Sequence, residues 1–237
     1  MLRKNIVKFN ILSLVFVFLF TLSSCNDSSN SETPQNYNIR NRDKVTKEDS
    51  IKFVNLNTNE PPNTIHYILD TVKSKIEWSC DIHNGYVKFK QGEIGLSDKI
   101  IVSGTFIVSM DSIVNLDIDY QLMKGTLEKI LKSPDFFNTQ QYPTSVFKID
   151  STKKLNGDDY LISGYMKIFN VINPVSFKSK VIINKDTVDA TSQKFSIDRT
   201  KWGMLVYTKD HIKNEDGFIV PNEIYLKIHL IALKRNK

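Results

Sequence analysis

Apolar and polar residues alternate with a period of two over most of the chain that follows residue 65. Within each alternating segment, one parity is apolar and the other is mainly polar or charged, as in residues 76–82, 102–110, 162–168, 175–183 and 224–232. This alternation indicates half-buried β-strands. Turn-forming residues punctuate the pattern at Asn84-Gly85, Asn156-Gly157-Asp158, Asn173-Pro174 and Asn184-Lys185-Asp186. Strands of this number and spacing predict an antiparallel all-β sandwich or barrel.

One segment follows a helical period instead. Met123, Leu127, Ile130 and Leu131 fall on one helical face, and Pro134 ends the run. A single inserted helix is unusual in a β-sandwich, whereas a barrel often carries one as a lid or plug. The pattern therefore favours a barrel with one inserted helix.

The N-terminal residues have the pattern of an export signal. Arg3, Lys4 and Lys8 precede an apolar run over residues 11–22, which is too short for the roughly 20 residues of a membrane-spanning helix. The run ends in Leu-Ser-Ser-Cys25, which resembles a bacterial lipobox. We therefore predict a lipoprotein signal peptide over residues 1–24 and a lipidated Cys25; the alternative is an ordinary signal peptide with an incidental cysteine.

The predicted lipid anchor sets the expected location. Stable anchoring requires more than one acyl chain, which bacterial lipoprotein modification supplies at a single cysteine. Asn26 rather than Asp follows the cysteine, and in many bacteria this favours the outer membrane. We expect a lipid-anchored protein of the bacterial cell envelope, at the outer membrane, with no preference between its periplasmic and surface faces.

Residues 25–64 are rich in Asn, Ser, Thr and charge and end in Pro61-Pro62. This composition predicts a flexible spacer of roughly 35 Å reach ahead of a domain over residues 65–235. One weakly apolar patch, residues 51–54, interrupts the spacer. It is interpreted as part of a loosely ordered tail, with a short strand or a partner-binding segment as alternatives.

Composition limits the classes of function. The chain has 237 residues, 41% hydrophobic, and a formal charge of +6, of which residues 25–237 carry only +3. This small excess does not favour a nucleic-acid partner, which needs clustered basic residues. Two cysteines exclude a disulfide scaffold and a four-thiolate zinc site. No cofactor is predicted, and the composition gives no information on a protein partner.

Several motifs together resemble the YceI-like family. The segment 131–138 (LKSPDFFN) and the following 142–147 (YPTSVF) are similar to the family's "LKSPDFFD" and "YPTATF" elements. Residues 67–70 with 76–78 resemble its opening strands, and 83–94 its hairpin. Two further similarities follow in order, at 104–110 (GTFIVSM) and 195–203 (FSIDRTKWG).

The resemblance implies an eight-stranded antiparallel, lipocalin-like barrel that holds a long isoprenoid lipid, a polyprenyl lipid or an isoprenoid quinone, in an apolar tunnel without catalysis. Eight strands leave an interior just wide enough for side chains or for one slim ligand. The sequence alone does not distinguish a filled barrel from a hollow one, so an envelope stress or interaction protein with a solid barrel is the alternative. The expected tunnel lining consists of apolar residues, namely Trp78, Phe106, Val108, Phe136, Phe137, Ile162, Met166, Ile168, Val175, Phe177, Ile224, Leu226 and Ile228.

The polar candidates are fewer. Asp198 and Arg199 are candidates for a ligand headgroup, with a structural ion pair as the alternative. The chain also departs from the family where many members have histidine, at Ile130 and within the segment 169–175. If those histidines recognise a headgroup, the ligand of this chain differs.

A catalytic or metal site is not expected. Cys80 could pair with a histidine, His66, His83, His211 or His229, as a nucleophile. It shares the apolar parity of its strand, however, and a buried cysteine behaves as a small hydrophobic residue. The histidines have no metal-binding spacing. Asp135 is interpreted as a turn residue after Pro134.

Overall fold

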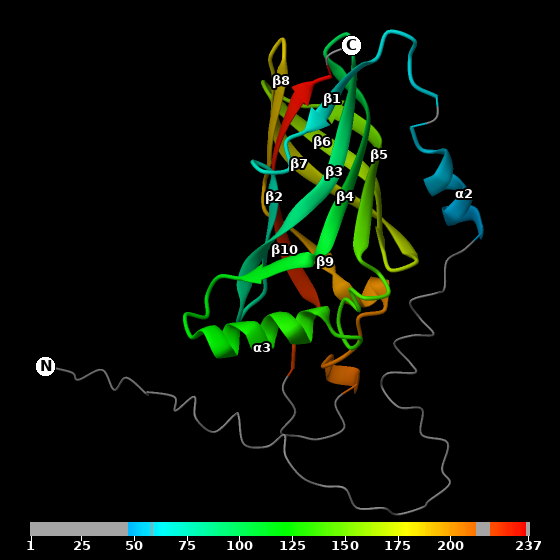
Figure 1. The fold of residues 1–237 in the computed structure, drawn as a ribbon. Helices are drawn as coiled ribbons and strands as arrows, with labels where there is room; N and C mark the ends of the chain where they lie inside the picture. Colours follow the sequence, from blue (N-terminus) through cyan, green and yellow to red (C-terminus); the bar gives the residue numbers. More distant parts are fainter. Residues whose placement is uncertain (1–46, 58, 212–218, 236–237) are drawn as a thin grey trace, which may run out of the picture. The chain divides into compact units, whose positions relative to one another are not determined.

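The computed structural model describes residues 47–57, 59–211 and 219–235 (Figure 1). The predicted signal peptide and Cys25 lie outside these residues. Within them, no helix is long and apolar enough to cross a membrane. The elements in chain order are α2 (Lys47–Asn55), β1 (Ile65–Leu69), β2 (Lys75–Ser79), β3 (Asn84–Ser97), β4 (Ile100–Asn115), α3 (Gln121–Lys132), β5 (Thr144–Lys154), β6 (Asp159–Ile168), β7 (Val171–Ile183), β8 (Thr187–Ser192), β9 (Phe195–Asp198), the 3-10 helices η2 (Arg199–Trp202) and η3 (Lys209–His211), and β10 (Glu223–Lys234).

The strands form one antiparallel sheet that closes into a barrel (Figure 1). Strands β3 to β8 pair in sequence order, and β10 completes the ring. The short strands β1 and β2 both lie between β3 and β10, and β8 and β9 both pair with β10 on its other side. Eight strand positions therefore surround the interior, which confirms the predicted eight-stranded antiparallel barrel.

The alternation of the sequence places the core. In β7, buried Val175, Phe177 and Val181 alternate with exposed Lys178 and Lys180. The parity predicted for β6 is confirmed in the same way, and in β10 buried Leu230 and Ala232 have the predicted parity. Each large apolar side chain that leaves water contributes about 1.5–3 kcal/mol, so the inward face supplies the main stabilisation of the barrel.

The boundary of β2 differs from the prediction. The strand ends at Ser79, residues 80–83 form the connection, and Ile82 is 44% exposed rather than inward. Asn84-Gly85, predicted as a turn, begins β3, and the segment compared with a hairpin is this single strand of 14 residues. Gly85 is required there because a Cβ would lie 1.9 Å from the carbonyl oxygen of Val114 and 2.7 Å from the ring of Trp78.

The predicted turn at Asn173-Pro174 is also absent, because both residues lie inside β7. Proline lacks an N–H group and is tolerated in a strand where that strand has an unpaired edge. This part of β7 has such an edge, since β7 pairs with β8 only from Ser179 to Ile183.

The predicted helix is α3, which lies across one end of the barrel (Figure 1). Met123, Leu127 and Leu131 are half-buried, whereas Ile130 is 43% exposed and does not join them. The helix ends at Lys132, because Ser133 adopts the extended backbone that a following proline favours. The half of the barrel nearest α3 is called the lower half below.

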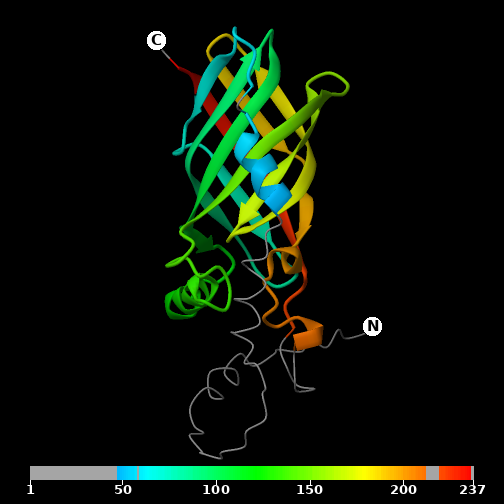
Figure 2. The ribbon, with the colours of Figure 1, turned by 90° about the vertical axis from the view of Figure 1, so that its right-hand side faces the viewer.

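The last part of the expected spacer is an ordered helix rather than a flexible coil. Figure 2 shows α2 along the outer wall of the barrel. Phe53 is buried at 9% exposure, and its carbonyl oxygen accepts a hydrogen bond from Lys148 Nζ at 3.1 Å. Lys52 Nζ donates to the Tyr165 hydroxyl and lies 4.6 Å from the centre of that ring. Asn57 donates to the Gly104 carbonyl at 3.0 Å. These long-range contacts explain why composition alone did not predict the helix.

Candidate functional site

The upper half of the barrel interior is filled. Val188 and Ala232 have no solvent-accessible surface, and Ile94, Leu96 and Val181 are buried at 3–4%. Such values are typical of a close-packed core without space for a ligand. A long ligand that runs the full length of the barrel would therefore require the upper side chains to move.

The lower half of the interior is less complete. Ile224, Leu226 and Ile228 lie on the inward face of β10, yet all three remain half-buried. Trp78, which is paired with Leu226 in the sheet, and Met166 on β6 are half-buried as well. These residues form a partly accessible apolar surface, named the lower interior here. All five belong to the predicted tunnel lining.

The remaining lining residues predicted on strands are buried. They are Phe106, Val108, Ile162, Ile168, Val175 and Phe177. Buried Phe89 and Phe147, which are not among the predicted lining residues, pack among them: the Phe147 and Phe177 ring centres lie 5.7 Å apart, and those of Phe89 and Phe106 6.2 Å apart. In this strand, Phe147 and Ile149 alternate with Val146 and Lys148, and this alternation predicts that the first two residues point inward.

Phe136 and Phe137 occupy the loop after α3. Phe136 is buried, and its ring centre lies 6.1 Å from that of Tyr207. Phe137 is half-buried and packs against the main core. Phe136 thus joins the α3 loop to the loop after η2, at the lower end of the barrel.

Arg199, a predicted headgroup candidate, has another set of partners. The side chain is 2% exposed and donates four hydrogen bonds to backbone carbonyl oxygens, namely those of Met204 at 2.6 Å and of Val206, Val220 and Pro221 at 2.9 Å each. Burial lowers the pKa of Arg199, and the nearby Asp198 and Cys80 partly offset this shift. Four of its five N–H groups are thus used to hold the loop after η2 against the start of β10.

Asp198, the second headgroup candidate, caps η2. Its Oδ1 accepts hydrogen bonds from the Thr200 backbone N–H at 2.9 Å and from the Thr200 hydroxyl at 2.6 Å. This is the ordinary role of an Asp at a helix N-cap. The contacts of both residues account for them as structural groups, and a role toward a ligand headgroup stays a prediction.

Cys80 is a free, half-buried cysteine beside the lower end of β2. Its Sγ donates a weak hydrogen bond to the His83 carbonyl oxygen at 3.5 Å. The imidazole of His83 is directed elsewhere, with Nδ1 2.8 Å from the Asp117 carboxylate. The contact of Cys80 with His83 is therefore to the backbone, not to a base.

The other described histidine side chains also lie beside carboxylates. His66 lies between Glu60 and Glu93, with Nε2 3.2 Å from Glu60. His229 Nε2 lies 3.4 Å from Glu77. Within residues 47–57, 59–211 and 219–235, no group of three or more metal-binding side chains has a geometry that could hold an ion.

The family's histidine positions are apolar here and differ in environment. Ile130 is exposed on α3, whereas Phe169 is 3% exposed and packs edge-to-face on Tyr142, with ring centres 5.2 Å apart. Phe169 therefore replaces a polar group by an aromatic contact at the lower end of β6. The structure brings no imidazole among the described residues to either position.

Trp78 has a feature that parity did not predict. Its indole N–H is shielded from solvent and has no hydrogen-bond partner within the described part of the chain. The other tryptophan, Trp202, donates its N–H to the Met166 carbonyl at 3.1 Å. A buried N–H group without a hydrogen-bond partner costs free energy, so the Trp78 indole carries a cost that the Trp202 indole does not.

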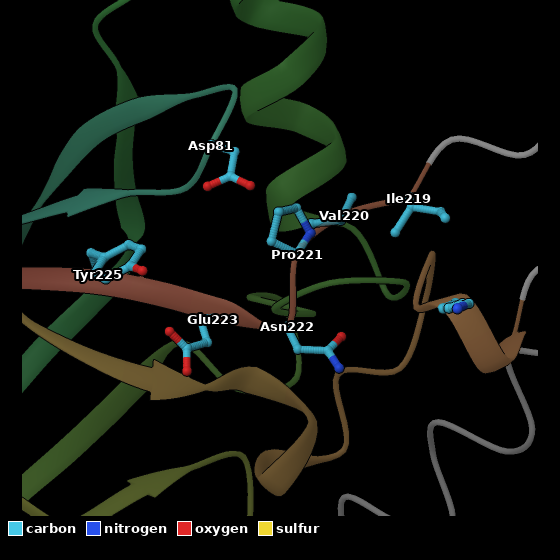
Figure 3. Close-up of a pocket in the computed structure, with 8 residues that line it drawn as sticks. Asp81, Ile219, Val220, Pro221, Asn222, Glu223 and Tyr225 are labelled. Carbon is cyan, nitrogen blue, oxygen red and sulfur yellow. The ribbon is translucent and has the colours of Figure 1, made fainter.

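A shallow hollow of about 400 Å³ lies outside the lower interior (Figure 3). Its lining combines carboxylates, an amide and a lysine with apolar groups, namely Asp81, Lys209, Ile219, Val220, Pro221, Asn222, Glu223 and Tyr225. Tyr225 has the outward parity of β10, so this hollow does not continue the inner surface. None of its residues was predicted as a site residue, and its mixed lining does not suit a long apolar chain.

These features define a class of protein: an antiparallel barrel with an apolar interior, closed at its upper half and partly accessible below. Residues 67–232 match the YceI-like domain family. Because this match covers more than half of the chain, the protein belongs to that family, and the resemblance found in the sequence is confirmed.

Similar proteins support the fold. The crystal structure of Burkholderia cenocepacia BcnA covers 69% of this chain and 99% of its own, with a TM-score of 0.56 and 20% identity. A polyisoprenoid-binding domain from Saccharophagus degradans, implicated in plant cell wall breakdown, covers 72% and 99%, with a TM-score of 0.52 and 14% identity. Protein YceI of Escherichia coli O17:K52:H18 is 42% identical over 55 residues, which span 23% of this chain and 28% of that protein.

Proposed function

We propose that this protein binds a long isoprenoid-type lipid, either a polyprenyl lipid or an isoprenoid quinone, and stores or carries it in the bacterial envelope without chemical change. The lower interior carries the proposal, because inward-facing Ile224, Leu226 and Ile228 keep accessible apolar surface inside a closed barrel. Covering such surface contributes about 25 cal/mol per Å². The polyisoprenoid-binding domain of Saccharophagus degradans, which has the same fold, supports the choice of ligand.

The proposal is tested by native mass spectrometry of the full chain, extracted in mild detergent from a bacterial host. We expect the protein to carry adducts with the masses of isoprenoid lipids. A chain that never carries such an adduct would contradict the proposal. The filled upper half of the barrel would then favour the alternative, a scaffold protein that acts in envelope interactions or stress.

A pair of tryptophan substitutions locates the ligand. Val175 is 8% exposed and inward on β7, whereas Lys178 of the same strand is exposed. If the ligand space extends from the lower interior to Val175, Val175→Trp occupies that space and reduces the recovered lipid at least severalfold, while stability changes by less than about 1 kcal/mol. In a filled core the same change would cost about 1–3 kcal/mol or more. Lys178→Trp should alter neither property.

The membrane anchor is part of the same proposal. We infer that Cys25 carries the lipid of a bacterial lipoprotein and that the barrel is thereby held at the outer membrane. Metabolic labelling with a palmitate analogue should label the wild-type chain and not Cys25→Ser. Equal labelling of both chains would show that Cys25 is not the attachment site, and fractionation of the labelled envelope identifies the membrane.

A further inference from the structure

The wall of the barrel has a gap in its backbone pairing. On one side, β7 pairs with β6 from Val171 to Lys180. On the other side, its ladder with β8 covers only Ser179–Ile183, and one further bond joins the Gln193 N–H to the Lys178 carbonyl at 2.8 Å. Beyond this point, β9 pairs with β10 instead. No backbone hydrogen bond joins residues 171–177 to residues 195–202, all of which the structure describes.

This gap, named the seam here, is consistent with the sequence of β7. A closed barrel normally leaves no strand edge unpaired. Pro174 lies within the unpaired stretch and has no N–H group to donate, so a ladder on this side would lose a bond at that residue. The proline is therefore matched to an edge that stays open.

Side chains close the seam where the backbone does not. The rings of Phe177 and Phe195 stack across it, with centres 4.6 Å apart and planes inclined by 12°. Asn173 Nδ2 donates to the Lys201 carbonyl at 3.0 Å. Trp202 donates across to the Met166 carbonyl on β6. Side chains change rotamer far faster than a paired segment unfolds, so this part of the wall can open without breaking a backbone ladder.

The seam borders the lower interior directly. Phe195 is paired with Leu226 in the sheet, and Ile197 with Ile224. Strand β9 therefore borders both the seam and the lower interior. Met166, whose carbonyl Trp202 binds, is itself part of the lower interior. By contrast, α3 lies across the lower end of the barrel, and the upper interior is packed (Figure 1).

We propose that the seam is the lateral port through which an elongated apolar ligand enters and leaves the barrel, with the stacked Phe177 and Phe195 as its latch. The inference rests on the proposed lipid-binding function and adds the route of exchange. It also predicts that exchange depends on the loop held by Asn173 and Trp202 rather than on movement of α3.

A reversible cross-link tests the port. Asn173→Cys and Lys201→Cys are introduced together into the full chain, with Cys25 and Cys80 changed to serine. The seam is closed by a disulfide, or by a short bis-maleimide if the thiols do not pair. All-trans-retinol, a fluorescent isoprenoid alcohol, is the probe. Closure should slow both its uptake and its release by about tenfold or more, and reduction of the disulfide should restore the rates.

Removal of the latch should have the opposite effect. For Phe195→Ala, we expect the association and dissociation rates of retinol to rise together by about tenfold, with Kd changed less than about threefold. Phe106→Ala is the matched control, because Phe106 is also a buried interior ring but lies on β4, where it is paired with Gly92 of β3 on one side and with Phe147 of β5 on the other. It should change the dissociation rate without a matching rise in association.

The outcomes separate the port from the function. Unchanged rates in the cross-linked protein, with retinol still bound, would overturn the port and leave lipid binding intact. Equal acceleration of association in both alanine variants would overturn the latch. If the wild-type chain bound neither retinol nor any lipid from its host, the proposed function and the port that rests on it would both be overturned.

Discussion

Nη1 of Arg199 lies 2.6 Å from the carbonyl oxygen of Met204, inside a site where the arginine is 2% exposed. This bond and three others join a charged side chain to uncharged backbone groups. The arginine thereby ties the loop after η2 to the segment that leads into β10. Arg199, which the sequence motif suggests as a ligand-binding residue, therefore holds two loops in position through these bonds.

Arg199→Met should destabilise the protein by about 3 kcal/mol or more, because it removes four charge-assisted bonds and leaves their carbonyl groups without the partner. Urea unfolding measures the change. Arg235→Met is the control, since Arg235 is 55% exposed in an ion pair with Glu93, and such surface pairs contribute about 0–1 kcal/mol. Equal effects of the two substitutions would contradict the structural role of Arg199.

The two tryptophans should respond differently to loss of the indole N–H. Trp202→Phe removes the bond to the Met166 carbonyl and should cost about 2–3 kcal/mol, whereas Trp78→Phe removes a donor that has no partner among the described residues. We expect Trp78→Phe to be less destabilising by at least about 1 kcal/mol. Thermal unfolding of ligand-free protein compares them, and a reversed order would show that Trp78 has a partner in solution.

Two glycines should give changes of opposite sign. Gly85→Ala places a methyl group against the Val114 carbonyl and the Trp78 ring and should destabilise by about 2 kcal/mol or more. Gly125 lies on α3 with nothing within 4 Å of an added Cβ, so Gly125→Ala should stabilise by about 0.5–1 kcal/mol. Chemical denaturation measures both, and tolerance of Gly85→Ala would mean that β4 shifts away at this point.

Stability should fall at acid pH partly through Asp117. Partial burial alone would raise the pKa of Asp117, but hydrogen bonds from the Asn84 N–H, His83 and Asn115 outweigh it and lower the pKa. A carboxyl pKa that is lower in the folded state stabilises the protein above the unfolded value of about 3.9, and this contribution is lost as the pH falls through the folded value. Asp117→Asn should flatten this part of the stability profile, which urea unfolding at several acid pH values measures.

The docking of α2 should depend on Phe53. Phe53→Ala removes the buried ring of the helix, so we expect trypsin to cleave at Lys52 about tenfold faster, because cleavage follows the population of the open segment. Ile51→Ala, at a position that is 53% exposed, should leave the rate within about twofold. The same rate for both variants would indicate that the polar contacts of Lys52 and Asn57 alone hold the helix.

The fold class could be predicted from local patterns alone, because the period of two is a local property of each strand. The parities of β6, β7 and β10 follow from single segments, and so does the helical period of α3. The motif string was sufficient to identify the family, since it carries order and spacing over most of the domain. The parity of each strand also shows which side chains point inward, but it does not show which residues pack around them.

The solvent accessibility of the inward-facing residues depends instead on contacts between segments that are far apart in the chain. Val188 and Ile228 both have inward parity, yet the first is fully buried and the second half-buried, because the opposite wall comes from distant parts of the chain. Pro174 can lie inside β7 because β9 pairs with β10 and leaves this edge of β7 unpaired. That pairing also depends on segments that are distant in the sequence. Arg199 likewise acquired its partners from residues up to 22 positions away. Such properties arise from segments that meet only when the barrel closes, so no local pattern encodes them.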